Sequence, residues 1–203
     1  MKNILLLALL LPISVNADYA GFSVSRAYQK LPDSAFYNPG GRDMRSSTRT
    51  NQFRLYAGTQ SGIWIAEIGG GTLSSYRSRN RGPVPGRPMG CCDIAQKINT
   101  YNVYGSAGVS LPVTSGLSVF AMAGATYVFG TNHEYGENEN GPNQDHRNVT
   151  RDLAPIYMAG FKYKISESAR LRLDYTAIND VAKSHWTLHS DIRSASVGLE
   201  MDF

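Results

Sequence analysis

The sequence contains almost no long run of apolar residues. Its longest, from Ile4 to Leu11, is too short to cross a bilayer as a helix, which needs about 20 apolar residues. No other run approaches that length. If the protein lies in a membrane, it therefore crosses the membrane as β-strands.

The single apolar run has the layout of a secretory signal peptide. Lys2 precedes it, and Pro12 and the small-residue site Val15-Asn16-Ala17 follow it. We expect cleavage after Ala17, which makes residues 1–17 the signal peptide and residues 18–203 one mature domain that begins at Asp18. No cysteine lies near the cleavage site to accept a lipid.

Cysteine is scarce as well, and the only two, Cys91 and Cys92, are adjacent. The cell envelope is oxidising, but a disulfide between neighbours needs Cα atoms closer than the usual ~4.4–6.8 Å and a strained peptide. A strained vicinal bridge, two free thiols and an intermolecular bond all stay open.

An excess of charge of one sign is also missing. The chain has 20 Lys and Arg against 16 Asp and Glu, a formal net charge of +4. A net positive charge this small does not indicate a nucleic-acid partner.

Apolar and polar residues alternate with the period of a β-strand through most of the chain. In the last strand, Arg193, Ala195, Val197, Leu199, Met201 and Phe203 share one face, and small or acidic residues occupy the other. The alternation predicts eight strands, at about 18–31, 51–60, 63–73, 98–111, 117–130, 153–165, 169–180 and 190–203.

The connections between these strands are alternately short and long. Bacterial outer-membrane barrels place short turns at the periplasmic rim and longer loops outside, so the pattern predicts an eight-stranded antiparallel transmembrane β-barrel with both ends at the periplasmic rim. A soluble barrel such as a lipocalin would alternate too, with its apolar face inward. The loop asymmetry favours the membrane barrel, as do aromatic residues near strand ends, which we expect in two interfacial girdles: Tyr19, Trp64, Tyr127, Phe129, Tyr157, Tyr163 and Phe203.

Several segments resemble OmpA-like transmembrane domains. These are residues 53–58 with 65–70, residues 104–112 with 117–127, residues 157–163, and the ending in Phe203. The resemblance covers essentially the mature chain and implies an outer-membrane barrel of a Gram-negative bacterium. The sequence stops at Phe203 without the periplasmic domain that binds peptidoglycan in two-domain members, so it is similar to the small single-barrel members. Phe203 also resembles the terminal aromatic signal that the barrel-insertion machinery reads.

Charged residues on the predicted inner face are balanced in sign. Because a buried charge is costly without a partner, we expect an interior ion-pair network. An eight-stranded barrel is about filled by its own side chains, and a packed lumen is therefore expected over a narrow gated channel. Glu67 resembles the inward Glu that the family pairs with basic residues. The network candidates are Arg54, Glu67, Lys162, Arg170, Arg172, Asp174, Glu200 and Asp202.

The long connections differ in charge. Residues 74–97 are predicted to form an irregular basic loop, in which Arg77, Arg79, Arg81 and Arg87 are candidate contacts for lipopolysaccharide phosphates. A solvated loop with incidental charge is the alternative. Residues 131–152 are predicted to form an acidic loop. His133 and His146 lie there without metal-ligand spacing, and we expect no metal or other cofactor.

The sequence thus predicts a monomeric structural or surface-interaction protein that acts through its external loops. Its expected partners are outer-membrane lipid, lipopolysaccharide, the insertion machinery and host surface molecules. Residues 185–191 offer His, Ser and Asp to a lipid A-modifying enzyme, but neighbours on a strand point to opposite faces. We expect no catalysis; that enzyme and a narrow gated channel are the alternatives.

Overall fold

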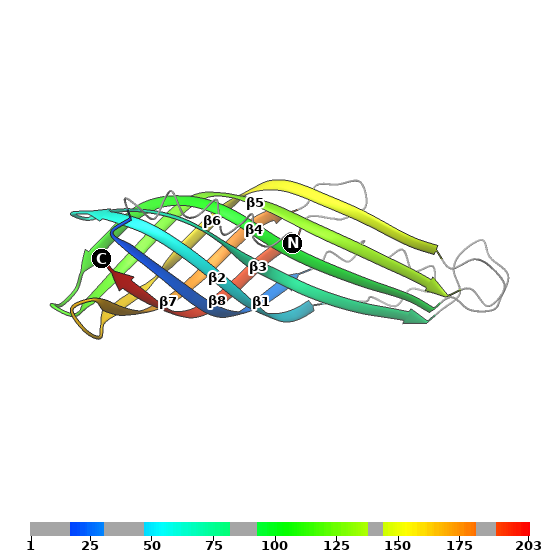
Figure 1. Ribbon diagram of the computed structural model, residues 1–203, viewed down its shortest axis with the longest axis horizontal. Coiled ribbons are helices and arrows are strands. Elements are labelled where there is room, and N and C mark those ends of the chain that lie inside the picture. The colour runs from blue at the N-terminus through cyan, green and yellow to red at the C-terminus, as the bar shows by residue number, and fades with distance from the viewer. Residues whose placement is uncertain (1–16, 31–46, 82–92, 138–143, 182–189) are drawn as a thin grey trace.

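The computed structural model describes residues 17–30, 47–81, 93–137, 144–181 and 190–203 (Figure 1). These residues form eight strands: β1 (Tyr19–Lys30), β2 (Ser47–Ser61), β3 (Trp64–Arg81), β4 (Asp93–Pro112), β5 (Leu117–Glu137), β6 (Gln144–Lys164), β7 (Ala169–Val181) and β8 (Ser190–Asp202). In the described ranges, no helix is long and apolar enough to span a membrane. The predicted signal peptide falls almost entirely outside them.

The strands close into one antiparallel barrel, in which each strand pairs with its sequence neighbours and β1 pairs with β8. The backbone N–H of Phe203 donates to the carbonyl of Asp18 at 3.0 Å, so the wall is continuous at the seam. Because successive side chains of a strand point to opposite sides, they divide between the outer face of the barrel and the lumen. Leu173 is 47% exposed on the outside, whereas its neighbour Arg172 is fully buried in the lumen. The predicted eight-stranded barrel is confirmed.

Three tight turns lie together at one rim. Gly62 connects β2 to β3 with a φ of +59°, a conformation that favours glycine. In the turn from β4 to β5, the Thr114 hydroxyl accepts hydrogen bonds from the backbone N–H groups of Gly116 and Leu117. The turn from β6 to β7 is closed by backbone bonds to the carbonyl of Ala169. Short turns mark the periplasmic rim of an outer-membrane barrel, so the opposite end faces outward.

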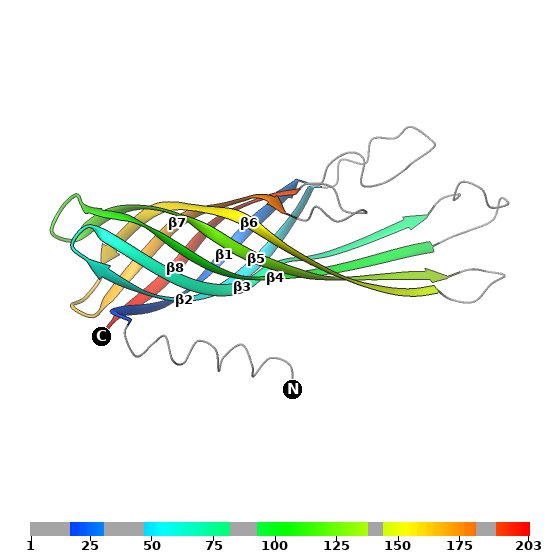
Figure 2. The ribbon, with the colours of Figure 1, turned by 90° about the horizontal axis from the view of Figure 1, so that it is seen from above.

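Strands β3 to β6 extend well beyond the outer rim, as Figure 2 shows. The prediction of irregular loops over residues 74–97 and 131–152 is therefore wrong for most of both segments. Pairing continues to Arg81 with Asp93 and to Gly136 with Gln144. By contrast, β2 pairs with β3 only as far as Arg54 and Gly71. The four long strands form a sheet above the membrane, which we call the sheet extension.

Exposed aromatic residues lie near both rims, but Tyr157, which we also expected in a girdle, is exposed about midway along the wall, opposite Ala123 and Ala177. Trp64 and Tyr163 are exposed near the periplasmic rim, and Tyr101 and Phe129 stack at 5.8 Å toward the outer rim. Tyr19, which we expected in a girdle, is only 1% exposed. Tyr19 lies on the lumen face because it is four residues from buried Ser23 on β1, and side chains an even number of residues apart on a strand share a face.

Candidate functional site

A charged network fills the middle of the lumen, with Arg172 of β7 at its centre. Its Nη1 lies 2.5 Å from Glu67 Oε2 of β3 and 3.0 Å from Glu200 Oε1 of β8. Its Nε lies 2.9 Å from Asp174 Oδ2 on the same strand. All four side chains are buried, and charge-assisted hydrogen bonds of this kind are stronger than those between neutral groups.

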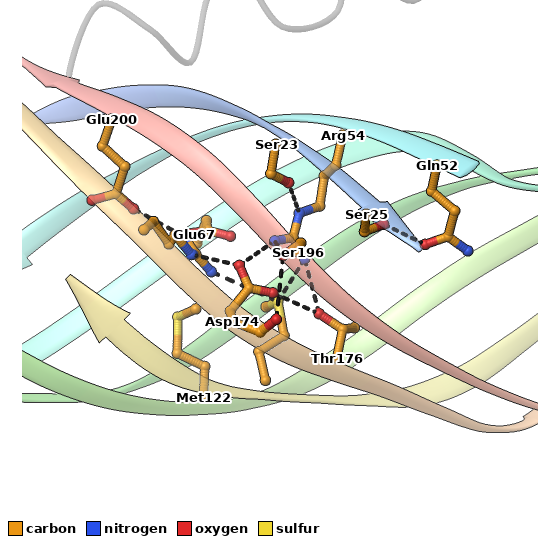
Figure 3. Close-up of polar contacts among 12 residues, drawn as sticks. Ser23, Ser25, Gln52, Arg54, Glu67, Met122, Asp174, Thr176, Ser196 and Glu200 are labelled. Carbon is orange, nitrogen blue, oxygen red and sulfur yellow. Dashed lines mark hydrogen bonds and ion pairs between the residues drawn. The ribbon is translucent and has the colours of Figure 1, made fainter. Parts of the chain in front are cut away.

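Two more cations complete the network, and Figure 3 shows one of them, Arg54, beside Asp174 and Thr176. Arg54 of β2 reaches across the lumen, where its Nη2 lies 2.6 Å from Asp174 Oδ2 and its Nη1 donates to the Thr176 hydroxyl at 3.0 Å. The Nζ of Lys162 on β6 lies 3.0 Å from Glu200 Oε2. Each acid therefore contacts at least one cation, and no single wall of the barrel supplies the whole network.

Three lumen tyrosines support these charges. Tyr104 donates to Glu67 Oε1 at 2.6 Å, and Tyr19 donates to Glu67 Oε2 at 3.4 Å. The Arg172 guanidinium lies 4.6 Å from the Tyr56 ring centre, within the range of a cation–π contact.

Each tyrosine lies opposite a glycine on a neighbouring strand. Tyr19, Tyr56 and Tyr104 face Gly58, Gly21 and Gly69, respectively. A β-carbon at any of these glycines would collide with the tyrosine ring. Sequence reasoning missed this role, although a lumen-facing Tyr beside Gly in the next strand was a usable signal.

The network is neutral as a set. Arg54, Lys162 and Arg172 balance Glu67, Asp174 and Glu200 deep in the lumen. The remaining predicted pair, Arg170 and Asp202, lies 2.8 Å apart near the periplasmic rim and is about a quarter exposed. The structure thus brings all eight predicted lumen residues into ion pairs. Balanced pairing removes most of the cost of burying charge, and it leaves no acid of the network without a cation to act as a free base.

Above this network, the lumen changes character toward the outer rim. A cavity of about 20 Å³ lies beside Arg54, with polar residues such as Gln52 and Asn102 and the apolar residues Ile156, Ile178 and Ile192 in its lining. A cavity of this size has room for about one water. Ile156, Ile178 and Ile192 are buried on the same inner face. In the described strands, the lumen therefore changes from the charged network to a mixed polar and apolar lining toward the outer rim.

The other predicted site residues lie elsewhere. Arg77, Arg79 and Arg81 occupy alternate positions of β3, and the loop assigned to them is wrong because this segment pairs with β4. Arg87, Cys91, Cys92 and residues 185–189 lie outside the described residues. Phe203 ends the wall and is 80% exposed. Among the side chains that the structure describes, no group of three or more His, Cys, Asp and Glu could hold a metal ion.

A closed antiparallel barrel with an apolar outer belt, a charged lumen and tight turns at one rim defines an outer-membrane β-barrel. The family model for the OmpA-like transmembrane domain matches residues 67–203, and the chain belongs to that family. The resemblance expected from the sequence is therefore confirmed, and the outer membrane is its location. A comparison with curated proteins found no match.

Solved structures give the same fold. Neisserial surface protein A is 13% identical, with a TM-score of 0.55 over 91% of this chain and 96% of that chain. OprG of Pseudomonas aeruginosa is 10% identical, with a TM-score of 0.55 over 92% and 96%. The attachment invasion locus protein Ail of Yersinia pestis is 12% identical, with a TM-score of 0.50 over 91% and 98%. Identities this low show the fold alone.

Proposed function

We propose that the protein is a surface-interaction protein whose sheet extension binds phosphate groups of lipopolysaccharide outside the membrane. Its lumen charges already neutralise one another, so the barrel serves as a rigid support. The residues left to meet a partner are those beyond the outer rim. In this proposal the protein acts as a monomer, by binding and without catalysis.

A row of basic positions across the sheet extension carries the proposal. In register, Arg77 of β3 is opposite Lys97 of β4, Lys97 is opposite His133 of β5, and His133 is opposite Arg147 of β6. Residues directly opposite each other share a face of the sheet, and neighbouring strands are about 4.8 Å apart. The row therefore spans all four strands of the sheet extension on one face.

Such a row is unfavourable unless an anion covers it. Like charges directly opposite each other destabilise a strand pair, and Arg77 beside Lys97 is such a pair. A phosphate group would turn this repulsion into attraction, because guanidinium binds phosphate in a bidentate way. Arg79 follows on the same face about 6.7 Å further along β3, opposite Ala95, whereas Arg81 is opposite Asp93, so the excess of basic positions lies at the base of the sheet extension and not at its tip.

A polyanion is also the ligand in one structural neighbour. Ail of Yersinia pestis was solved in complex with the heparin analogue sucrose octasulfate. Sulfate and phosphate groups offer similar oxygen acceptors to arginine. We therefore include a sulfated host glycan as a second probe, with lipopolysaccharide phosphate as the proposed ligand.

The test is a binding titration of the folded barrel with lipopolysaccharide polysaccharide released from its lipid. We compare wild type with the variant R77Q/R79Q/R81Q/R87Q at low and moderate salt. Binding should weaken in the variant, and the wild-type affinity should fall with salt because exposed charges are screened over about 8–10 Å. Lys164→Gln removes one exposed charge near the opposite rim, and it is the control for Arg77→Gln.

Three results would contradict the proposal. The first is equal affinity of wild type and the quadruple variant, and the second is an equal loss in Lys164→Gln and Arg77→Gln. The third is binding of the sulfated glycan alone, which would replace the bacterial ligand with a host partner.

A further inference from the structure

The upper edge of the barrel's apolar belt is unevenly charged. We follow the outward positions of each strand away from the periplasmic turns, leaving out Ser61 and Thr59 beside the turn of β2, to the first polar residue at the outer edge of the apolar belt. These residues are Arg26 on β1, Asn51 on β2, Thr72 on β3, Asn99 on β4, Thr131 on β5, Arg151 on β6, Asn179 on β7 and Arg193 on β8. Two of the three arginines in this set lie on the adjacent strands β8 and β1.

The register gathers cations around Tyr28. Tyr28 is opposite Arg193 of β8 on one side and opposite position 49 of β2, also an arginine, on the other. Arg26 precedes Tyr28 by two residues on β1 and is thus the diagonal neighbour of both. Diagonal neighbours on one face are about 7–8 Å apart, which is within the reach of long side chains. We call Arg26, Tyr28 and Arg193 the boundary cluster.

The boundary cluster lies at the height of the lipid head groups. Arg193 is ten residues before Phe203, which ends the wall at the periplasmic rim. Ten residues that rise about 3.3 Å each along a strand tilted by about 40° span roughly 25 Å, which is the height of the apolar band in such barrels. Below the cluster, Val24, Phe53 and Val197 are exposed apolar residues that face lipid.

The cations of this cluster are incompletely paired. Arg26 is exposed and has no ion-pair partner among the residues that the structure describes. One nitrogen of Arg193 lies 3.4 Å from Asp191, which leaves most of its five N–H donors for another acceptor. Asp191 is itself opposite Lys30 in the register. Positive charge therefore exceeds negative charge at the boundary, where like charges repel unless an anion lies between them.

We propose that the boundary cluster binds the phosphate head group of a lipid A molecule in the outer leaflet, with Arg26 and Arg193 as its principal ligands. Guanidinium groups bond phosphate through paired N–H donors. The acyl chains of the same lipid would lie on Val24, Phe53 and Val197. This site is on the opposite wall from the sheet extension and goes beyond the proposed function, because its ligand is a lipid embedded beside the barrel.

The test measures lipid retention by native mass spectrometry of the folded barrel released from nanodiscs. The nanodiscs contain phosphatidylcholine with either diphosphoryl lipid A or dephosphorylated lipid A as the probe. Retention of diphosphoryl lipid A should fall about tenfold in R26Q/R193Q, since each lost charge-assisted bond weakens the complex. Arg151→Gln, an exposed arginine at the same boundary on β6, is the matched control and should retain the lipid.

The outcomes separate the proposal from its alternatives. Normal retention in R26Q/R193Q, an equal loss in Arg151→Gln, or equal retention of the dephosphorylated probe would each overturn it. Binding of inorganic phosphate alone as tightly as diphosphoryl lipid A would overturn the assignment to a lipid. If R26Q/R193Q fails to fold, the single variants Arg26→Gln and Arg193→Gln provide the test, and each should retain less diphosphoryl lipid A than wild type. The variant R77Q/R79Q/R81Q/R87Q should keep the lipid, so this site and the proposed function can fail independently.

Discussion

Replacing Arg172 by methionine should destabilise the folded barrel by about 3–5 kcal/mol, because it leaves a buried charge without its partner. Asp174 keeps Arg54, and Glu200 keeps Lys162. Glu67 loses the one cation that it contacts among the described residues and keeps two tyrosine hydroxyls. The uncompensated charge is therefore that of Glu67.

A second substitution isolates this cause. Adding Glu67→Gln to Arg172→Met restores the balance of the inner set, with Arg54 and Lys162 against Asp174 and Glu200. Replacing a buried ion pair by neutral residues is often nearly neutral in stability, so the double variant should recover more than half of the loss. Arg170→Met is the control. Its pair at the rim is partly exposed, and its loss should cost about 0–1 kcal/mol.

The assay is equilibrium unfolding in urea of the barrel in lipid vesicles, followed by tryptophan fluorescence. The free energies of unfolding of wild type, both single variants and the double variant form a thermodynamic cycle. A cost below about 1 kcal/mol for Arg172→Met, or a further loss on adding Glu67→Gln, would refute the reasoning. Either result would mean that water reaches Glu67 in the folded state.

Three other predictions test other parts of the barrel. Leu173→Arg places a charge on the lipid face and should lower the free energy of unfolding by about 2–4 kcal/mol in the same assay. The effect of Ser196→Arg, on the lumen face, should depend on how the lumen is packed. If Leu173→Arg folds as well as wild type, the assignment of the outer and inner faces is wrong. Deleting Phe203 should leave secretion intact but reduce the heat-modifiable form on gels of outer membranes, and unchanged levels would count against its role as an assembly signal. The Thr59 hydroxyl and the Gln60 N–H hold the pKa of Asp18 below its ordinary value of 3.8, so their contribution to stability is present above that pH and is lost as the pH falls through the lowered pKa. Thr59→Val should raise the pKa of Asp18 in an NMR titration, and an unchanged pKa would show that the hydroxyl has no part in it.

Most of the fold follows from the alternation of apolar and polar residues along the chain. Successive residues of each strand face lipid and the filled lumen in turn, so the polarity changes at every residue. This places all eight strands and assigns the lumen charges to their face. The same reasoning failed above the membrane. Residues such as Ser78 and Asn80 of β3 are in a strand without any apolar face, since both sides of the sheet extension lie beyond the lipid. Nothing in their sequence distinguishes such a strand from a loop.

The contacts between strands could not be predicted in the same way. Tyr19 was assigned to the girdle because aromatic residues near strand ends usually lie there, yet its parity places it opposite Gly58 and beside Glu67. The boundary cluster depends on the register between β8 and β1, whose residues are far apart in sequence. Register follows from the closure of the whole barrel, which no local pattern contains.

The seam between Asp18 and Phe203 makes the barrel suitable for circular permutation. Because these residues are hydrogen-bonded at one rim, a short linker could join them, and new ends could be opened in the turn at residues 113–116. Every strand pair would persist, with Phe203 in its place in the wall but no longer at the chain terminus. The permuted protein would thus test whether assembly depends on the place of Phe203 in the wall or on a free chain end beside it.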